Sequence, residues 1–350
     1  MVLIYGIIAI ILLALELLYF KVADHFNIID KPNERSSHST IVVRGGGVIF
    51  ALSALVWSGL QASHGNWPAI AAHWTFLAGL ILIAVISFID DIVSLSVSAR
   101  MVGQFIAATF ALYNFGMLAA LHTPGVTIPG IIVTLFIFLI SLIIYVGAMN
   151  VINFMDGING MTGAYCLAVL IPMYLINNHN QYILQSLIAV LIISVLVFCL
   201  FNFREKGRAK CFAGDVGSIS IGFTLLFMTC EIVLKTHDLT YMIFLVVYGV
   251  DGVLTICHRI LLHENLGVAH RKHLYQLLSN ELHMSHILVS TIYAGLQIAI
   301  SLGFIYLCPH NATCHWIYFI GTLLILSIIY ILFKKKYYHL HEEYLANLKK

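Results

Sequence analysis

Acidic and amide side chains recur at short intervals in one segment of an otherwise apolar chain. The segment NVINFMDGINGM, residues 150–161, places Asn150, Asn153, Asp156 and Asn159 three residues apart. On a helix that continued through them, these side chains would fan slowly around one side. Amide and carboxylate oxygens beside exposed backbone suit a hydrated Mg²⁺ or a polar ligand such as a nucleobase. A structural helix cap would need only one such residue.

Three further acidic residues, in two motifs, could do the same chemistry. Asp90 and Asp91 end an apolar run in FIDDIVS, and their mutual repulsion favours a cation such as a metal ion or Arg100 nearby. Asp215 lies in AGDVGS after four basic residues, a pattern suited to phosphate plus metal at a helix start. The simpler interpretations are solvated helix ends for the acids and a positive-inside anchor for the basic residues.

Cationic residues form two more groups. In RGGG, residues 44–47, three glycines follow Arg44; their amides could open the next helix as an anion site, or the segment could be a flexible turn. The group HRKH, residues 270–273, suits an anion clamp better than a zinc site, because no cysteine accompanies it. Leucines at helical spacing over 274–282 predict an interfacial amphipathic helix, which makes contact with lipid headgroups the alternative function.

Apolar helices must position these residues. Apolar residues make up 61% of the chain and charged residues only 10%, whereas a soluble domain carries about a quarter charged residues. Apolar runs of about 20 residues, enough to cross a bilayer, recur throughout. The sequence therefore predicts an all-α integral membrane protein with about eleven transmembrane helices, at 2–20, 45–63, 71–89, 101–121, 130–149, 161–177, 183–201, 217–235, 239–257, 286–307 and 315–333.

The distribution of Lys and Arg predicts the orientation of these spans. Basic residues accumulate in cytoplasmic loops, and with a periplasmic N-terminus all of the 18 basic residues except Lys235 fall inside. We therefore expect a cytoplasmic C-terminus, with residues 1–333 as one membrane domain and 334–350 as a short basic cytoplasmic tail. The first span lacks a basic start and a small-residue cleavage site, so it is not read as a cleaved signal peptide. In the outer loop CPHNATC, a disulfide between Cys308 and Cys314 stays open as an option.

Together, the inside loops would gather carboxylates and cations at one membrane face. This combination is what phosphoryl transfer requires, because positioning and charge neutralisation do most of that catalysis. A transporter or channel would instead hold such residues near mid-membrane, where only Asp251 is expected. A catalytically inactive scaffold of the same fold is a third interpretation, and the intact acidic positions argue against it.

On these motifs the chain resembles the polyprenyl-phosphate N-acetylhexosamine-1-phosphate transferases. This superfamily, glycosyltransferase family 4, includes the phospho-MurNAc-pentapeptide translocases. The matching stretches follow in family order through alternate inside loops between about residues 30 and 280, namely RSSHSTIVVRGGG, DD, NVINFMDGING, FAGDVGS and HRKHLYQ. The third and the last look most similar to the O-antigen-initiating branch.

The resemblance implies a reaction, a cofactor and a location. The enzyme would transfer a HexNAc 1-phosphate from a UDP-amino sugar to polyprenyl (undecaprenyl) phosphate and release UMP, which initiates O-antigen or other cell-envelope polysaccharide synthesis. It would use Mg²⁺, with Mn²⁺ as an allowed substitute, in the bacterial inner membrane with its active site formed by cytoplasmic loops. No nucleic acid is expected as a partner, and a homodimer is compatible with the sequence. The sequence leaves the donor sugar open among GlcNAc, FucNAc, QuiNAc and others.

The resemblance also implies roles for the acidic positions. Asp215 would bind the metal ion, with Asn153 beside it. Asp90 and Asp91 would lie near the attacking lipid phosphate. Asp156 would organise the metal and diphosphate surroundings.

The remaining candidates would contact the substrates. His270 and His273, with Arg271, would bind the diphosphate and the leaving UMP. Asn159 lies where relatives contact uracil. Further substrate contacts are expected from Arg44, Arg100 and Asn150.

Three departures from the family pattern qualify these roles. Many relatives carry another acid after the DD pair, several have Asp at position 159, and the family's His-rich motif is HRKH here. The last departure makes a histidine nucleophile less attractive. A single displacement by the lipid phosphate is favoured because a phosphate monoester is already largely dianionic at neutral pH. A double displacement through Asp90 or Asp156 stays open, and Asp251 is expected to be structural.

Overall fold

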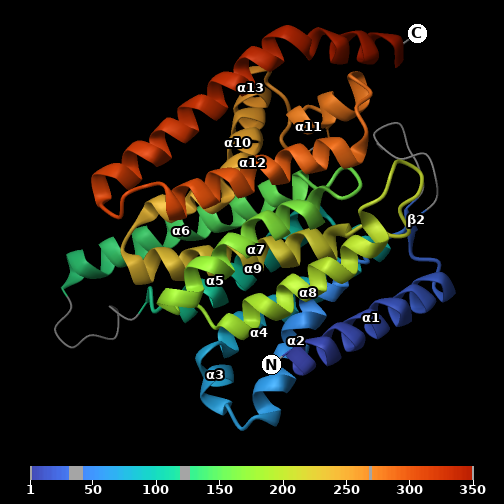
Figure 1. Ribbon diagram of the computed structural model, residues 1–350. Coiled ribbons are helices and arrows are strands. Elements are labelled where there is room, and N and C mark those ends of the chain that lie inside the picture. Colours follow the sequence, from blue (N-terminus) through green and yellow to red (C-terminus); the bar gives the residue numbers. More distant parts are fainter. Residues whose placement is uncertain (1, 31–41, 119–126, 268–269, 349–350) are drawn as a thin grey trace.

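The computed structural model describes residues 2–30, 42–118, 127–267 and 270–348. They form a bundle of long helices (Figure 1). The helices are α1 Val2–His25, α2 Val48–Ser63, α3 Trp67–Ala72, α4 Trp74–Val93, α5 Val97–Asn114, α6 Ile128–Phe154, α7 Met161–Asn180, α8 Gln185–Asn202, α9 Gly214–Thr236, α10 Val246–Leu261, α11 Leu274–Gln276, α12 His286–Tyr306 and α13 Ala312–Leu348. A 3₁₀ helix, η2 (Leu239–Leu245), precedes α10, and a π-helical turn, η3 (Leu277–Glu281), follows α11. Strands β1 (Ile29–Asp30) and β2 (Val42–Val43) pair antiparallel.

Each of the eleven predicted spans coincides with a helix, so the prediction of an all-α membrane protein is confirmed. Within the described residues, nine helices are long and apolar enough to cross a bilayer. The two remaining predicted spans correspond to α2, which has only 16 residues, and to the more polar α5. The number of crossings and the orientation in the membrane stay predictions.

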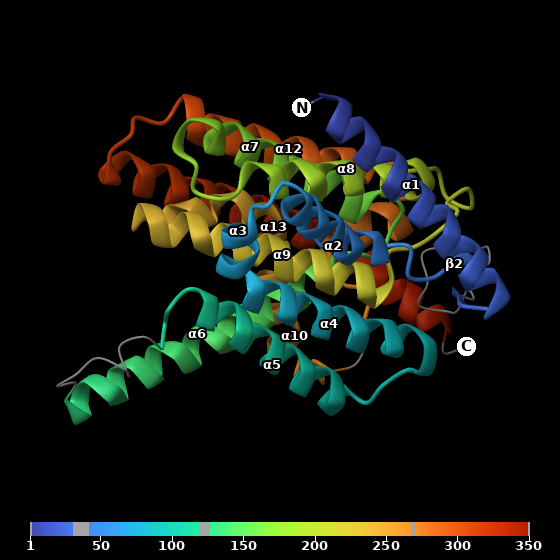
Figure 2. The same ribbon diagram turned by 90° about the horizontal axis from the view of Figure 1, so that it is seen from below.

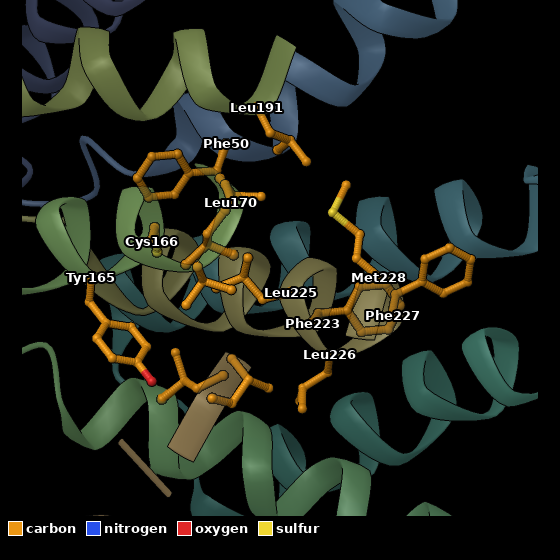
Figure 3. Close-up of a cluster of buried hydrophobic side chains, with 14 of the residues drawn as sticks. Phe50, Tyr165, Cys166, Leu170, Leu191, Phe223, Leu225, Leu226, Phe227 and Met228 are labelled. Carbon is orange, nitrogen blue, oxygen red and sulfur yellow. The ribbon is translucent and has the colours of Figure 1, made fainter. Parts of the chain in front are cut away.

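Helix α9 lies at the centre of the bundle. It packs against α2, α4 and α6 and is buried along most of its length. Its aromatic residues stack on neighbouring helices, with the Phe227 ring centroid 4.2 Å from that of Phe76. Figure 3 shows Phe223 and Phe227 of α9 in the same cluster as Phe50 and Leu191. A helix that is apolar on all sides is expected inside a large bundle, and α9 therefore provides a rigid centre.

Helices α6 and α13 lie at the periphery. The first part of α6 extends away from the other helices (Figure 2), and α13 runs across the outside of the bundle with most of its apolar side chains exposed. Lipid would cover such surfaces in a membrane protein. Helix α6 continues to Phe154, beyond the predicted end at 149, and carries two of the predicted site residues, Asn150 and Asn153, on its last turns.

The structure decides one local option that the sequence left open and corrects one local prediction. Cys308 and Cys314 are both free thiols, with Asn311 Nδ2 lying 3.2 Å from Cys314 Sγ. Residues 274–282 form helical turns, but Tyr275 and Leu277 are buried and η3 packs against α12 and α13. The segment therefore directs apolar side chains into the protein, and the predicted interfacial amphipathic helix is wrong.

Candidate active site

A cavity of about 610 Å³ lies among the ends of α4, α5, α6, α9 and α10. This volume is within the range of about 300–1,000 Å³ that is typical of small-molecule sites. One part of its wall is polar, with Ser87, Asp90, Arg100, Gln104, Asn150, Asn153, Asp215, Arg259, His270 and His273. The other part is apolar, with Ile83, Ile86, Val97, Met101, Phe105, Ile143, Val146 and Ile219 among its residues. The cavity is thus lined by charged, amide and apolar side chains together.

Asp90 enters the cavity from the last turn of α4. Its Oδ1 accepts a hydrogen bond from the Leu95 amide at 2.6 Å, and its Oδ2 lies 3.2 Å from Nη1 of Arg100. Arg100 stands on the first turns of α5, which begins after Ser96, whose hydroxyl accepts from the Ala99 amide. The short connection between α4 and α5 therefore fixes a carboxylate and a guanidinium side by side, as predicted for the DD pair and Arg100.

Asp91 has a different position from its neighbour and does not line the cavity. Its side chain is fully buried, and its two oxygens accept the amides of Asp215 and Val216, each at 2.9 Å. These amides belong to the first turn of α9, where backbone donors lack helical partners and favour negative charge. Asp91 is thus a helix cap supplied by α4. A position of Asp91 beside the lipid phosphate stays a prediction, and these buried contacts do not favour it.

The chain at the start of α9 can approach Asp91 because of glycine. Gly214 has a φ of +69°, and a Cβ there would lie 2.5 Å from Oδ2 of Asp91. Any other residue would be strained and would displace the carboxylate. The glycine that precedes Asp215 is therefore required by the contact between α4 and α9.

Arg44 completes this contact. Its Nε lies 2.7 Å from Oδ1 of Asp91, and its Nη2 lies 3.6 Å from Oδ2 of Asp215. Partial burial lowers the pKa of Arg44, but the charges of Asp91 and Asp215 outweigh this effect and raise it. Arg44 is therefore a permanent cation that orients both carboxylates.

The glycines after Arg44 serve packing. The amides of Gly46 and Gly47 donate to the carbonyls of Phe212 and Ala213 at 2.8 and 3.0 Å. A Cβ on Gly47 would lie 2.3 Å from the Cα of Gly217 in α9. Because the amides of Gly46 and Gly47 already have partners, the structure does not favour the anion-site interpretation of RGGG. Residues 31–41, which hold the rest of this motif, lie outside the described residues.

Asp215 and Asn153 meet at the polar part of the cavity, as predicted. The Asp215 carboxylate is 21% exposed, and its Oδ2 also lies 3.9 Å from Arg100 Nη1. Ser218, one turn along α9, donates to Oδ1 of Asn153 at 2.6 Å. Within the described residues, no three His, Cys, Asp or Glu side chains are grouped closely enough to hold a metal ion by themselves. One or two carboxylates with oxygen-rich neighbours nevertheless fit Mg²⁺, which takes its other ligands from water and substrate phosphates.

Asn150 also lines the cavity, but it is paired with Gln104 of α5. The Asn150 Nδ2 donates to Gln104 Oε1 at 2.6 Å, and Gln104 Nε2 donates back at 3.3 Å. The sequence interpretation missed Gln104, although it follows Arg100 by one helical turn and therefore lies on the same face of α5. The pair leaves amide groups on the cavity wall beside Asn153.

Asp156 and Asn159 do not line the cavity, because α6 ends at Phe154 and the chain turns away. Asp156 accepts a hydrogen bond from Thr162 Oγ1 at 2.5 Å, and burial raises its pKa to about 6. Asn159 is buried, and its Nδ2 donates to the carbonyls of Arg204 and Glu205 at 2.9 and 3.0 Å. The predicted direct roles of Asp156 at the diphosphate and of Asn159 at uracil are therefore not supported by their positions.

His273 is held in one orientation by Asp251. The two residues are buried, with Nδ1 of His273 3.2 Å from Oδ1 of Asp251. Asp251 also accepts from the Leu274 amide at 3.1 Å and from Tyr293 Oη at 2.6 Å. Within the described part of the chain, this leaves the buried Nε2 of His273 without a hydrogen-bond partner at the cavity. A carboxylate that fixes one imidazole nitrogen and leaves the other for a ligand is a common arrangement at reactive sites. Asp251 is thus structural, as expected.

The rest of the HRKH group divides between two environments. His270 lines the cavity beside His273, and burial together with the charge of His273 and neighbouring cations lowers its pKa to about 3. His270 is therefore neutral near pH 7. Arg271 is not part of the cavity wall, because its Nη1 donates to Tyr344 Oη of α13 at 3.0 Å. A direct contact of Arg271 with diphosphate is not supported by this position.

Arg259 is a cavity residue that was not predicted as one. It is buried on the last turn of α10 and lines the cavity. Its Nε lies 3.1 Å from Glu264, and its Nη groups donate to the carbonyls of Asn265 and Leu266 at 2.6 and 3.3 Å. Arg259 therefore holds the loop after α10 against the cavity. Arg259 follows the predicted span 239–257 by only two residues, and a basic residue so close to the inner end of an apolar span was the signal that could have identified it.

Residues 73–233 match the model of glycosyl transferase family 4. This region contains Asp90, Asn153 and Asp215, whereas Arg44 and the HRKH group lie outside it. The matched region thus covers the central helices α4–α9 and the carboxylates at their ends.

Individual curated proteins extend the similarity. The chain is 26% identical over 185 residues to a phospho-N-acetylmuramoyl-pentapeptide-transferase of Thermotoga neapolitana, covering 51% of this chain and 57% of that protein. It is 28% identical over 242 residues to the undecaprenyl-phosphate alpha-N-acetylglucosaminyl 1-phosphate transferase of Escherichia coli K12, covering 67% and 64%. A probable undecaprenyl-phosphate N-acetylglucosaminyl 1-phosphate transferase of Bacillus subtilis is 24% identical over 265 residues, covering 73% and 70%. The chain thus spans less than two thirds of the length of the Thermotoga and Escherichia coli proteins.

Proposed function

The chain belongs to glycosyl transferase family 4, and from this premise we propose that it transfers a HexNAc 1-phosphate from a UDP-activated amino sugar to polyprenyl phosphate. UMP would be released, and a polyprenyl-diphosphate sugar would form. The observation that carries the proposal is the cavity whose lining combines Asp90, Arg100 and Asp215 with many apolar side chains. One substrate of this reaction is an anionic nucleotide sugar and the other is a phosphate on an apolar chain, so both kinds of surface are needed in one site.

The polar part of the cavity provides what phosphoryl transfer requires. Arg100 lies on the cavity wall, and Nη2 of Arg44 lies 3.6 Å from Oδ2 of Asp215. Neutralising phosphate charge and aligning the reacting groups supply most of the rate enhancement in this class of reaction. The amides of Asn150 and Gln104, in the same wall, offer hydrogen-bond donors and acceptors to a sugar or a base.

A divalent cation, proposed to be Mg²⁺, would be held by Asp215 with Asn153. When bound, it would neutralise charge on the diphosphate of the donor. Asp215 and Asn153 present oxygen ligands toward the cavity, and Ser218 fixes the amide of Asn153 by a 2.6 Å hydrogen bond.

We favour a direct displacement. An oxygen of the lipid phosphate attacks the β-phosphorus of the donor, and the bond from that phosphorus to the bridging oxygen breaks. The electron pair leaves with UMP. Because a phosphate monoester has a second pKa near 6, no strong base is needed. Asp90 then orients Arg100 and the acceptor, and the unpartnered Nε2 of His273 is available to a phosphate oxygen.

The bacterial relatives support a more specific proposal about the substrates, the pathway and the cellular location. The names of the Escherichia coli and Bacillus subtilis proteins specify undecaprenyl phosphate and N-acetylglucosaminyl 1-phosphate. We propose undecaprenyl phosphate as the acceptor, a UDP-HexNAc as the donor, and a site facing the cytoplasm of a bacterial inner membrane. The product would begin an O-antigen or another cell-envelope polysaccharide.

Replacement of Asp215 by Asn tests the site. UMP release by purified Asp215→Asn protein is expected to fall at least about a hundredfold, because a charged ligand in the transition state is lost. The matched control is Asp24→Asn, which changes an exposed acid of α1. Unchanged turnover and unchanged metal dependence in Asp215→Asn would overturn the assignment of the metal position.

A further inference from the structure

The last helix is too long for the membrane alone. α13 has 37 residues, which correspond to about 55 Å of helix, whereas the hydrocarbon core of a bilayer is about 30 Å thick. The helix continues through the three lysines 334–336 as far as Leu348. Its final part runs over α11 in Figure 1. We call residues 334–348 the α13 extension.

One face of the α13 extension carries side chains that contact the segment around the cavity. Lys334 Nζ lies 2.9 Å from His258 Nδ1 and between the rings of Tyr330 and Tyr338. His341 Nδ1 lies 3.0 Å from Glu281 Oε1 in η3. Positions 334, 338, 341 and 344 are spaced by three or four residues and therefore lie on one face of the helix.

The HRKH group meets this face with its two central residues. The Arg271 guanidinium lies 4.7 Å from the centre of the Tyr344 ring and donates to its hydroxyl at 3.0 Å. The Lys272 ammonium lies 5.8 Å from the centre of the Tyr338 ring. His270 and His273 line the cavity instead. The α13 extension thus contacts the HRKH group through Arg271 and Lys272, while His270 and His273 line the cavity.

A chain of contacts leads from the α13 extension to the cavity wall. Lys272 forms an ion pair with Glu264, whose other oxygen lies 3.1 Å from Nε of Arg259. Burial raises the pKa of Glu264, but its hydrogen bonds with Lys272 and Arg259 and the charges of these residues together lower it, so Glu264 is ionised at neutral pH. Arg259 in turn holds the backbone of Leu266, a residue of the cavity wall.

We propose that the α13 extension is a brace that holds residues 262–267 and 270–273 against the cavity, with Tyr338 and Tyr344 as positioning residues. A cation over an aromatic face is attracted to the ring, so the Tyr344 and Tyr338 rings help to fix Arg271 and Lys272, while Glu264 pairs with both Lys272 and Arg259. The brace orients His273 for the phosphate contact, and in this respect it rests on the proposed function. The family match ends at residue 233, so this helix lies outside it.

Hydrogen–deuterium exchange of the full-length protein in lipid nanodiscs tests the brace without reference to catalysis. In the double variant Tyr338→Leu/Tyr344→Leu, amides of residues 262–276 are expected to exchange about tenfold faster. The double variant Tyr338→Phe/Tyr344→Phe keeps both rings and should retain most of the protection. The control is Tyr337→Leu, whose ring packs on Phe333 and lies near the Lys336 ammonium, both of the same helix. Unchanged exchange in the double Leu variant, with α9 still protected, would overturn the proposal.

UMP release by the same variants separates the brace from the proposed function. The double Leu variant is expected to raise the KM for the UDP-sugar about fivefold to tenfold, and the Phe variant should restore it. If no variant releases UMP, the wild type included, while exchange rises as expected, the proposed function fails and the brace stands. If the enzyme is active but exchange and KM are the same in all variants, the brace fails and the proposed function stands.

Discussion

Replacing Asp91 by Asn tests whether Asp90 and Asp91, which the sequence placed together near the lipid phosphate, have different roles. The structure gives Asp91 to the first turn of α9 and Asp90 to the cavity. Asn is nearly the same size as Asp but carries one oxygen and one NH₂ group. In Asp91→Asn, only one of the two α9 amides keeps an acceptor, and Arg44 loses its ion pair with Asp91 and keeps only the longer contact with Asp215, at 3.6 Å.

The size of the effect follows from these contacts. Asp91 accepts two backbone hydrogen bonds at 2.9 Å and lies 2.7 Å from Arg44. A hydrogen bond to a charged group contributes about 1.5–3 kcal/mol, and an unsatisfied buried amide costs about 1–3 kcal/mol. Arg44 is partly exposed and can be resolvated, so we take the lower end and expect a loss of about 3 kcal/mol in the free energy of unfolding. Asp90→Asn should cost about 1 kcal/mol, because its partner Arg100 is more exposed.

The assay is a comparison of apparent thermal midpoints, at one heating rate in one detergent, together with UMP release. Asp91→Asn should lower the midpoint by several degrees, whereas Asp90→Asn should stay close to the wild type and lose turnover. An Asp91→Asn protein with an unchanged midpoint and no turnover would refute the helix-cap interpretation, because Asp91 would then act on the substrates directly.

Three other changes test individual contacts. Burial raises the pKa of Asp156 from 3.8 to about 6, so the folded state retains a proton that the unfolded state releases. The free energy of unfolding should therefore fall as pH rises from about 4 to 6. The thermal midpoint of Asp156→Asn should lack this part of the pH dependence. Asn159→Asp would replace an NH₂ group that faces two carbonyls with an acceptor oxygen, at a cost of about 1–3 kcal/mol in the free energy of unfolding. Trypsin should then cleave within residues 204–210 faster than in the wild type. Equal cleavage rates would contradict this interpretation. Gly47→Ala should abolish the yield of folded protein because of its close contact with α9, whereas Gly59→Ala, which has open space around it, should express normally; equal yields would contradict the packing argument.

The helices were predictable because apolar runs of bilayer length are a strong signal, and each predicted span coincides with a helix. Their ends were less predictable. Helix α6 continues to Phe154, and α13 continues 15 residues beyond the predicted boundary at 333. A polar residue does not end a helix by itself, since helix propensity and contacts with other elements decide whether it continues.

The residue types at the site were predictable, but the direction of each side chain was not. Asp90 and Asp91 are neighbours on one helix, so they point about 100° apart, and only packing shows which one faces the cavity. The regular spacing of Asn150, Asn153 and Asp156 predicted a shared face, which holds for the first two. The helix ends before Asp156, and the shared face is lost there.

The most direct test of the central claim uses purified protein, undecaprenyl phosphate and a panel of UDP-sugars, with UMP release followed in Mg²⁺ or in EDTA. The account predicts catalytic release that requires the lipid phosphate and the divalent cation together and that is selective for a UDP-N-acetylhexosamine. Release that continues in EDTA or without the lipid phosphate would contradict it, as would the absence of release with every donor from protein whose thermal midpoint shows that it is folded.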